Sequence, residues 1–311
     1  MSSQAVCRGW CGVAALALTL ALAACQTAPP VPPVAPVTPV VEAPPVVVPK
    51  PIPKPPRIGL ALGGGAARGF AHIGVIQVLE ENGIRPDLVV GTSAGSLVAA
   101  IYASGKTGPE LALLAQNMDE GGISDWSFPG RGLIRGEALA KYVREQTGNR
   151  PIEQMKLPLG IVATDLDSGE PILFRRGDTG MAVRASSAIP AVFQPVRIGS
   201  REYVDGGLVS PVPVRFAREM GAQMVIAVDI TSPPDGNPTS DPFKLLMQTF
   251  TIMGKSINHF ELRDADAVVR PALAGVSSAD FTARLKAIQS GREAALKQLP
   301  EIRARILQLT K

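Results

Sequence analysis

The sequence predicts an α/β domain in which helices cover a mostly parallel sheet. Two observations lead to this prediction. Short apolar runs of strand length alternate with segments whose apolar residues recur at helical spacing. In addition, the run Ile58–Leu62, the helical segment Ala71–Asn82 and the run Leu88–Val90 follow one another closely. Two strands joined by a helix form a right-handed crossover between parallel neighbours.

The later elements continue this alternation. The polar turn Asp167-Ser168-Gly169-Glu170 separates two strands, 159–164 and 171–174, and predicts a hairpin. A second tight turn separates strands 196–198 and 202–204, and a buried strand is expected at 225–229. Further helices are expected at Leu97–Ala103, Glu110–Asn117, Glu137–Thr147, Asp178–Ala188, Phe243–Phe260 and Asp280–Leu299.

The N-terminal segment has the features of a secretory signal. An apolar run from Val13 to Ala24 is too short to span a bilayer comfortably, and small residues stand at its end. The sequence Leu22-Ala23-Ala24-Cys25 resembles the lipobox of bacterial lipoproteins. This resemblance implies a signal peptide over 1–24, acylation of Cys25 and a lipid anchor in the bacterial envelope. Gln26 favours the outer membrane; the alternative is ordinary signal cleavage with Cys25 incidental.

A proline-rich segment follows. Residues 25–56 are predicted to form an extended tether, because such a composition favours polyproline II and cannot build a packed core. Residues 57–311 then form the folded domain. This domain has 28 basic and 26 acidic residues, a balance that gives no reason to expect nucleic acid as a partner. It contains no cysteine, which excludes disulfides, thiolate metal sites and a cysteine nucleophile within it.

The segment Gly91-Thr92-Ser93-Ala94-Gly95 indicates a nucleophile elbow. An apolar strand precedes it and a helix follows, which is the setting that lifts a serine hydroxyl clear of the backbone. The alternative interpretation is a purely structural turn between strand and helix. Ser93 is therefore the candidate nucleophile.

The glycine cluster at residues 63–65 follows the first strand and precedes a helix. Backbone N–H groups in such a loop can receive an oxyanion or a phosphate. The rival interpretation is dinucleotide binding. It is disfavoured because Arg68 occupies the place of the third glycine, and no acidic residue ends the second strand.

Two bases are possible for Ser93. His259 with Asp229 would give a serine–histidine–aspartate triad in the chain order of α/β-hydrolases. Asp205, which follows a strand and precedes two glycines, would act alone. Its ordinary pKa is low for a base at neutral pH, but burial beside apolar groups would raise it. The other histidine, His72, is expected to be structural.

Four blocks together resemble the patatin-like phospholipases: Gly63–Gly69 with His72, Gly91–Gly95, Ala185–Pro190 and Asp205–Gly207. The resemblance implies a three-layer α/β/α sandwich and a Ser93–Asp205 dyad without a catalytic histidine. It also implies oxyanion donors at Gly63, Gly64, Gly65 and Ala94, with support from Arg68. The implied reaction is hydrolysis of phospholipid or lysophospholipid esters without a metal or organic cofactor.

Two further expectations remain open. Trp126 and Phe128, in a glycine-rich stretch, would either form a lid that touches membrane or pack inside the domain. The third interpretation of the whole chain is a lipid-binding lipoprotein that kept a hydrolase fold without its activity. The sequence gives no prediction of oligomeric state.

Overall fold

The computed structural model describes residues 53–118, 125, 131–235, 239–277 and 280–311. The chain divides after Pro51, and the second unit, Ile52–Lys311, contains every described helix and strand. The expected signal peptide, Cys25 and most of the tether lie outside the described residues, as do Trp126 and Phe128. Those expectations remain predictions.

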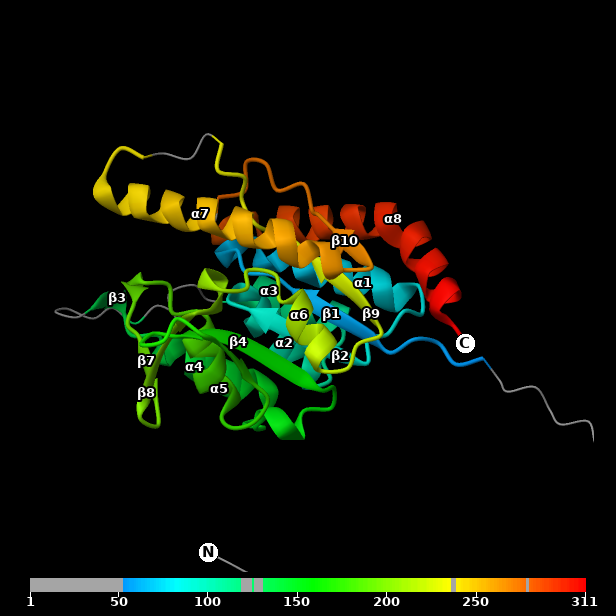
Figure 1. Ribbon diagram of the computed structural model, residues 1–311, viewed down its shortest axis with the longest axis horizontal. Coiled ribbons are helices and arrows are strands. Elements are labelled where there is room, and N and C mark those ends of the chain that lie inside the picture. The colour runs from blue at the N-terminus through cyan, green and yellow to red at the C-terminus, as the bar shows by residue number, and fades with distance from the viewer. Residues whose placement is uncertain (1–52, 119–124, 126–130, 236–238, 278–279) are drawn as a thin grey trace, which may run out of the picture. The chain divides into compact units, whose positions relative to one another are not determined.

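The main sheet is mixed, and most of its strands are parallel (Figure 1). Its strand order is β10, β9, β1, β2, β4, β8, β7, with β5 paired on β4. The pairs from β10 to β4 are parallel, whereas β8, β7 and β5 run antiparallel to their neighbours. The strands are β1 Ile58–Leu62, β2 Leu88–Thr92, β4 Leu159–Asp165, β5 Pro171–Phe174, β7 Val196–Ile198, β8 Arg201–Asp205, β9 Met224–Val228 and β10 Ala267–Val269.

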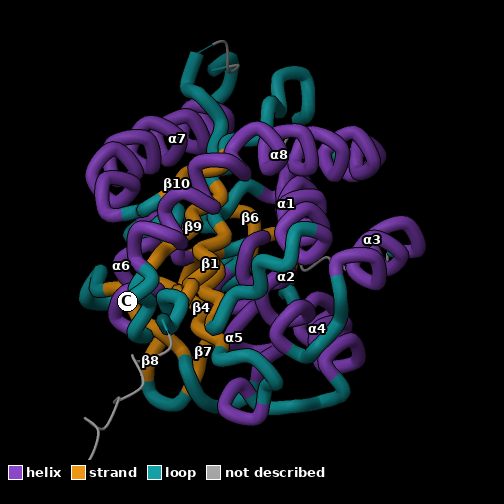
Figure 2. The backbone as a smooth tube through the Cα atoms, turned by 90° about the vertical axis from the view of Figure 1, so that its right-hand side faces the viewer, coloured by secondary structure: helices purple, strands orange, loops and turns teal. Residues whose placement is uncertain are grey.

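Helices cover both faces of this sheet (Figures 1 and 2). Side chains alternate across a strand, so Leu60 and Leu62 enter one core while Ala61 enters the other. The larger core packs β-strand residues against α1 Ala71–Glu81, α2 Ala94–Ala103, α3 Gly108–Asn117, α4 Glu137–Thr147 and α8 Arg284–Leu309. The smaller core packs against α6 Val214–Glu219. The three-layer arrangement with a mostly parallel sheet confirms the predicted fold class.

The sequence missed several short elements. β10 and α6 were not predicted, and neither was a separate two-stranded sheet of β3 Gly132–Ile134 and β6 Ala191–Phe193. Each of the three strands has only three residues, too few to show a clear alternation. The short helix α5 Thr179–Ser186 and the long helix α7 Pro242–Glu261 lie where helices were expected.

The predicted end of the last helix at Leu299 is wrong. α8 begins at Arg284 and continues through Pro300 to Leu309. Proline removes one backbone donor and normally breaks a helix. Here the turns beyond it are held by packing, because Ile302 is fully buried and Ile306 packs against the larger core.

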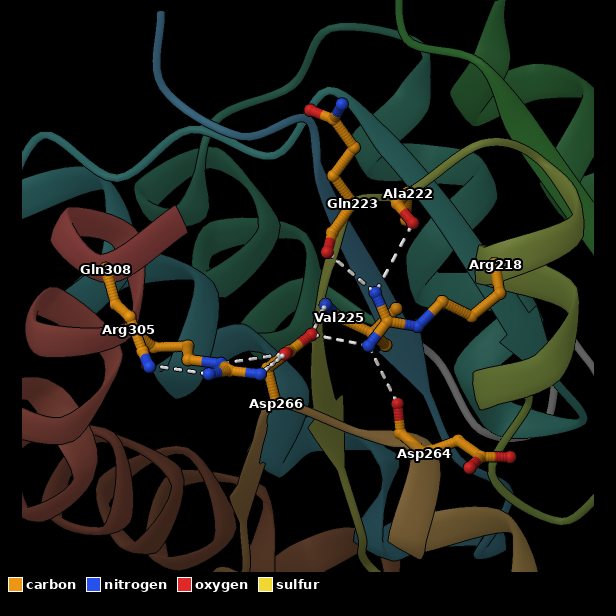
Figure 3. Close-up of polar contacts among 8 residues, drawn as sticks. All are labelled: Arg218, Ala222, Gln223, Val225, Asp264, Asp266, Arg305 and Gln308. Atoms are coloured by element: carbon orange, nitrogen blue, oxygen red, sulfur yellow. Dashed lines mark hydrogen bonds and ion pairs between the residues drawn. The ribbon is translucent and has the colours of Figure 1, made fainter. Parts of the chain in front are cut away.

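An ion-pair network joins α6 and α8 at the start of β10 (Figure 3). Asp266 Oδ2 accepts from Arg218 Nη2 at 2.6 Å and from the Val225 amide at 2.8 Å, while Oδ1 accepts from Arg305 Nε at 2.9 Å. Burial alone would raise the pKa of Asp266, but these donors outweigh it and lower the pKa. The network therefore connects α6 and α8, which lie on opposite faces of the sheet, to the edge strands β9 and β10.

No helix among the described residues is both long enough and apolar enough to cross a membrane.

Candidate active site

Ser93 occupies a sharp turn between β2 and α2. Its backbone has φ 53° and ψ −124°, a left-handed conformation that is strained for a residue with a side chain. The two glycines around it allow the close backbone approach. A Cβ atom on Gly91 would lie 2.4 Å from the Gly95 carbonyl oxygen, and one on Gly95 would lie 2.1 Å from the Leu62 carbonyl oxygen. The sequence pattern of the elbow therefore has a steric cause.

The Ser93 hydroxyl donates a hydrogen bond to Asp205. Its Oγ lies 2.6 Å from Asp205 Oδ2, and both residues are 6% exposed. Asp205 is the last residue of β8, and the turn η4 Gly206–Leu208 follows it. The structure thus brings together the two residues that the motif blocks single out.

Asp205 is held by several backbone contacts. Its Oδ1 accepts from the Gly207 amide at 2.7 Å, and its own carbonyl oxygen accepts from the Thr164 hydroxyl at 2.8 Å. Burial raises the pKa of Asp205 to about 6, although the hydrogen bonds from Ser93 and Gly207 act in the opposite direction. A carboxylate with a pKa near 6 is a far better proton acceptor at neutral pH than an ordinary aspartate.

Sequence reasoning assigned no role to Ser186. Its Oγ accepts from the Ser93 amide at 2.8 Å and donates to the Val162 carbonyl oxygen at 2.5 Å. This fully buried hydroxyl therefore fixes the backbone of the elbow against β4. The only signal in the sequence was its position in the block Ala185–Pro190.

The glycine loop after β1 lies directly against Ser93. A Cβ atom on Gly64 would be 3.1 Å from the Ser93 Cβ atom. The structure narrows the predicted set of oxyanion donors, because the Gly63 amide donates to Val228 O at 3.1 Å and the Gly64 amide to Pro211 O at 2.9 Å. Within the described part of the chain, the amides of Gly65 and Ala94 have no acceptor. Ala94 also begins α2, where the helix dipole favours negative charge.

Arg68 and His72 support this loop. Arg68 is largely buried and donates to the Ser232 hydroxyl and, at 3.4 Å, to the Gly65 carbonyl oxygen. Burial lowers its pKa, and Asp229 partly offsets this effect. His72 Nε2 lies 2.8 Å from the Gly63 carbonyl oxygen, and burial lowers the pKa of His72 to about 4. A neutral His72 therefore donates to the loop and is unsuited to act as a base.

The predicted alternative triad is not assembled. His259 Nε2 lies 2.6 Å from Arg263 Nη2 near the end of α7. Asp229 instead pairs with Arg270 at 3.3 Å and accepts from the Thr231 hydroxyl at 2.6 Å. Among the described residues, Asp205 is the one side chain that bonds the Ser93 hydroxyl.

Comparisons with known proteins identify the family of this chain. A sequence model described as patatin-like phospholipase matches residues 60–218. An uncharacterised NTE family protein of Mycobacterium tuberculosis is 39% identical over 184 residues, which cover 58% of this chain and 51% of that protein. Patatin-like phospholipase domain-containing protein 6 of Mus musculus is 33% identical over 183 residues, which cover 56% of this chain and 14% of that protein.

Among solved structures, VipD of Legionella pneumophila superposes with a TM-score of 0.57 and 15% sequence identity, covering 80% of this chain and 67% of that one. At that identity the likeness shows the fold alone. The matched family segment contains the glycine loop, the elbow and Asp205. The chain belongs to the patatin-like phospholipase family, and it spans about half the length of the mycobacterial relative.

Proposed function

We propose that this protein is a lipid acyl hydrolase of the phospholipase A or lysophospholipase type, in which Ser93 and Asp205 form the catalytic dyad. The observation that carries the proposal is the 2.6 Å hydrogen bond from the Ser93 hydroxyl to a buried carboxylate. Membership of the patatin-like phospholipase family supports lipid esters as the substrate class.

In the first half of the proposed reaction, Ser93 Oγ attacks the carbonyl carbon of the lipid ester. Its proton passes to Asp205 Oδ2, and negative charge develops on the former carbonyl oxygen. The free amides of Gly65 and Ala94 are the candidates to stabilise this oxyanion. The proton then moves from Asp205 to the leaving alkoxide, which leaves an acyl group on Ser93.

The second half reverses these roles. Water replaces the leaving group, and ionised Asp205 removes its proton as the oxygen attacks the acyl carbon. Collapse of the second tetrahedral intermediate breaks the bond to Ser93 Oγ, and the proton returns from Asp205 to that oxygen. The products are a free fatty acid and the unmodified enzyme. Every proton transfer involves Asp205 alone, so a catalytic histidine is not needed.

We further propose, from the lipobox-like sequence before Cys25, that the protein is anchored by acyl chains in the bacterial envelope, at the outer membrane. Replacement Cys25→Ser tests this proposal. Wild type should incorporate labelled fatty acid and the variant should not, and incorporation that persists in the variant would contradict acylation at Cys25.

The test of the proposed activity is fatty-acid release from phosphatidylcholine and lysophosphatidylcholine vesicles. Wild type is compared with Ser93→Ala and Asp205→Asn, and with Asp167→Asn on the exposed hairpin turn as a matched control. We expect both dyad variants to lose activity by about 10³-fold or more, and the control to retain it. Activity that survives in Asp205→Asn would rule out the dyad.

Two alternatives give different results in the same assay. A carboxylesterase would cleave a short soluble ester and leave every lipid intact. A lipid-binding lipoprotein without activity would cleave neither, and Ser93 in the folded protein would resist a fluorophosphonate probe. The triad predicts that His259→Ala abolishes activity, whereas the dyad predicts that it has no such effect.

A further inference from the structure

The outward side of α7 carries several large apolar side chains. Leu246, Met253 and Phe260 are separated by seven residues, which is two helical turns, and they are 38%, 46% and 65% exposed. Leu245 and Ile252 repeat the same spacing one position earlier and are about half exposed. The two rows lie on one side of the helix, with the exposed Thr249 and Ser256 between their members. We call these five apolar residues the α7 stripe. Figure 1 shows α7 along the margin of the domain.

The fully buried positions of α7 are small or polar. The buried residues of the helix are Gly254, Asn258 and Glu261. The side-chain amide atoms of Asn258 are buried without a hydrogen-bond partner among the described residues. A surface helix normally turns its apolar side to the core and its polar side to water. α7 departs from this rule, because it partly buries Met247, Phe250 and Ile257 but leaves the apolar side chains of the α7 stripe exposed. Burial within this domain therefore does not explain the side chains of the stripe.

Other exposed apolar residues of the domain do not form such a stripe. Leu113, Leu133 and Leu166 lie apart, on α3, on β3 and just after β4. Leu285, Leu296 and Leu307 share one face of α8, but three helical turns, about 16 Å, separate each from the next. Single exposed leucines of this kind are normal on protein surfaces, whereas a contiguous patch marks an interaction site.

The charges that border the stripe are mainly basic. Lys255 is exposed and has no ion-pair partner among the described residues, and Lys244 pairs with the capping residue Asp241 at 3.0 Å. The one acidic residue inside the helix, Glu261, is buried and faces the domain. An apolar stripe with a basic border complements a membrane surface that carries negative charge.

The inward side of α7 is connected to the candidate active site. Ser210 Oγ lies 2.7 and 2.8 Å from the two carboxylate oxygens of Glu261. The Ser210 carbonyl oxygen accepts from the hydroxyl of Thr92 at 2.9 Å, and Thr92 immediately precedes Ser93. Two hydrogen-bonded contacts therefore connect α7 to the segment that carries the candidate nucleophile.

We propose that α7 docks the domain on the surface of an anionic lipid membrane through the α7 stripe, with Lys255 at its border. The proposal rests on the proposed function in one respect, because a lipid hydrolase must reach a substrate that is packed in a bilayer. Docking through α7 would hold the domain at the bilayer that contains its substrate without the need for a spanning helix.

The test uses the full chain with Cys7→Ser, Cys11→Ser and Cys25→Ser, so that a single introduced thiol can be labelled. An environment-sensitive fluorophore is attached at Met253→Cys in the α7 stripe, or at Leu296→Cys on α8 as the control. Vesicles contain phosphatidylcholine with or without phosphatidylglycerol, and some carry spin-labelled lipid. Because the signal is local, membrane binding by the N-terminal segment does not produce it.

We expect the probe at residue 253 to shift to the blue and to be quenched by spin-labelled lipid, while the probe at 296 shows neither effect. Omission of phosphatidylglycerol should weaken the response about tenfold or more. Equal responses at the two positions would overturn the proposal. A response at 253 that appears on raising the protein concentration without vesicles would also overturn it, because the stripe would then bind a second copy of the chain.

A second measurement separates docking from catalysis. The triple variant Leu246→Gln, Met253→Gln, Phe260→Gln is compared with the triple variant Leu113→Gln, Leu296→Gln, Leu307→Gln. We expect the ratio of vesicle hydrolysis to soluble-ester hydrolysis to fall about 100-fold in the α7 variant only. An unchanged ratio would refute docking and leave the proposed function standing. If the residue-253 probe enters the bilayer but wild type cleaves no lipid, docking stands and the proposed function fails.

Discussion

The Ser93 hydroxyl reaches Asp205 across a single strand, although 112 positions separate the two residues in sequence. Strand β4 lies between β2 and β8 in the sheet. Thr92, just before Ser93, pairs with Val162 on one side of β4, and Asp205 pairs with Ala163 on the other. β2 runs parallel to β4, and β8 runs antiparallel to it. The last residues of β2 and β8 therefore lie beside neighbouring residues of β4. The geometry depends on this register, since a one-residue slip of β8 would turn Asp205 to the opposite face.

The first prediction concerns the pH dependence of catalysis. Burial raises the pKa of Asp205 to about 6, and only the ionised carboxylate can accept the Ser93 proton. We expect kcat/KM for a soluble ester to rise about tenfold per pH unit below pH 6 and to level off above it. Stopped-flow measurements across this range check it. A midpoint near pH 4 would contradict a buried base, and a midpoint that moves in His259→Ala would implicate the histidine.

The second prediction concerns stability. The pKa of Asp205 is raised from an ordinary 3.8 to about 6, so the folded state binds this proton more tightly than the unfolded state. Its contribution to stability is full below pH 3.8 and falls as the pH rises through 6. Asp205→Asn removes this loss and still offers an oxygen to the Gly207 amide. We therefore compare the free energies of unfolding of Asp205→Asn and wild type. From pH 4 to pH 8, the difference in favour of the variant should grow by roughly 3 kcal/mol.

Urea unfolding at both pH values measures this gain. Asp167→Asn on the exposed hairpin turn is the control, and it should not alter the pH dependence. If the stability difference between Asp205→Asn and wild type is the same at both pH values, burial does not raise the pKa of the Asp205 carboxyl group.

The parts of the site that the sequence predicted are those that appear as short local patterns. The glycines around Ser93 are visible as a five-residue pattern, although only Gly91 is crowded by the turn itself, and Gly95 is crowded by the Leu62 carbonyl oxygen of β1. Ser186 is different, because its role depends on contacts with Ser93 and Val162 across the sheet. The occupied amides of Gly63 and Gly64 likewise depend on acceptors far away in sequence.

The same distinction applies to the fold. The long helix over 243–260 was predicted, but the usual rule that the apolar side of a helix faces the core does not predict that several of its large apolar side chains stay exposed. Only the structure places Asn258 and Glu261 inside and Phe260 outside. Pro300 misled the prediction for the opposite reason, since a local rule for ending helices was outweighed by the burial of Ile302.

The third prediction tests the newly assigned role of Ser186. Ser186→Ala leaves the Ser93 amide without its buried acceptor, which should cost about 1–3 kcal/mol of stability and loosen the elbow. We expect kcat to fall by about 10- to 100-fold with little change in KM. Ser187→Ala is a matched control, because the Ser187 hydroxyl makes no hydrogen bond within the described part of the chain. Equal effects of the two substitutions would exclude a positioning role for Ser186.

The fourth prediction concerns the network around Asp266. Asp266→Asn leaves two partly exposed arginines and the Val225 amide with a neutral partner. We expect a loss of about 2–3 kcal/mol at pH 7, less than for a fully buried pair because water reaches both guanidinium groups. Glu145→Gln, which breaks the exposed pair with Lys141, should change stability by less than about 0.5 kcal/mol.

The pH dependence of the Asp266→Asn effect identifies its cause. The pKa of Asp266 is lowered in the folded state, so its contribution is present above the ordinary pKa of aspartate and is lost as the pH falls through the folded-state value. Wild type and Asp266→Asn should therefore converge in stability in strong acid, while the loss persists at pH 7. A difference that stays constant with pH would mean that packing at this position, and not the charge of Asp266, holds α6 and α8 to the sheet.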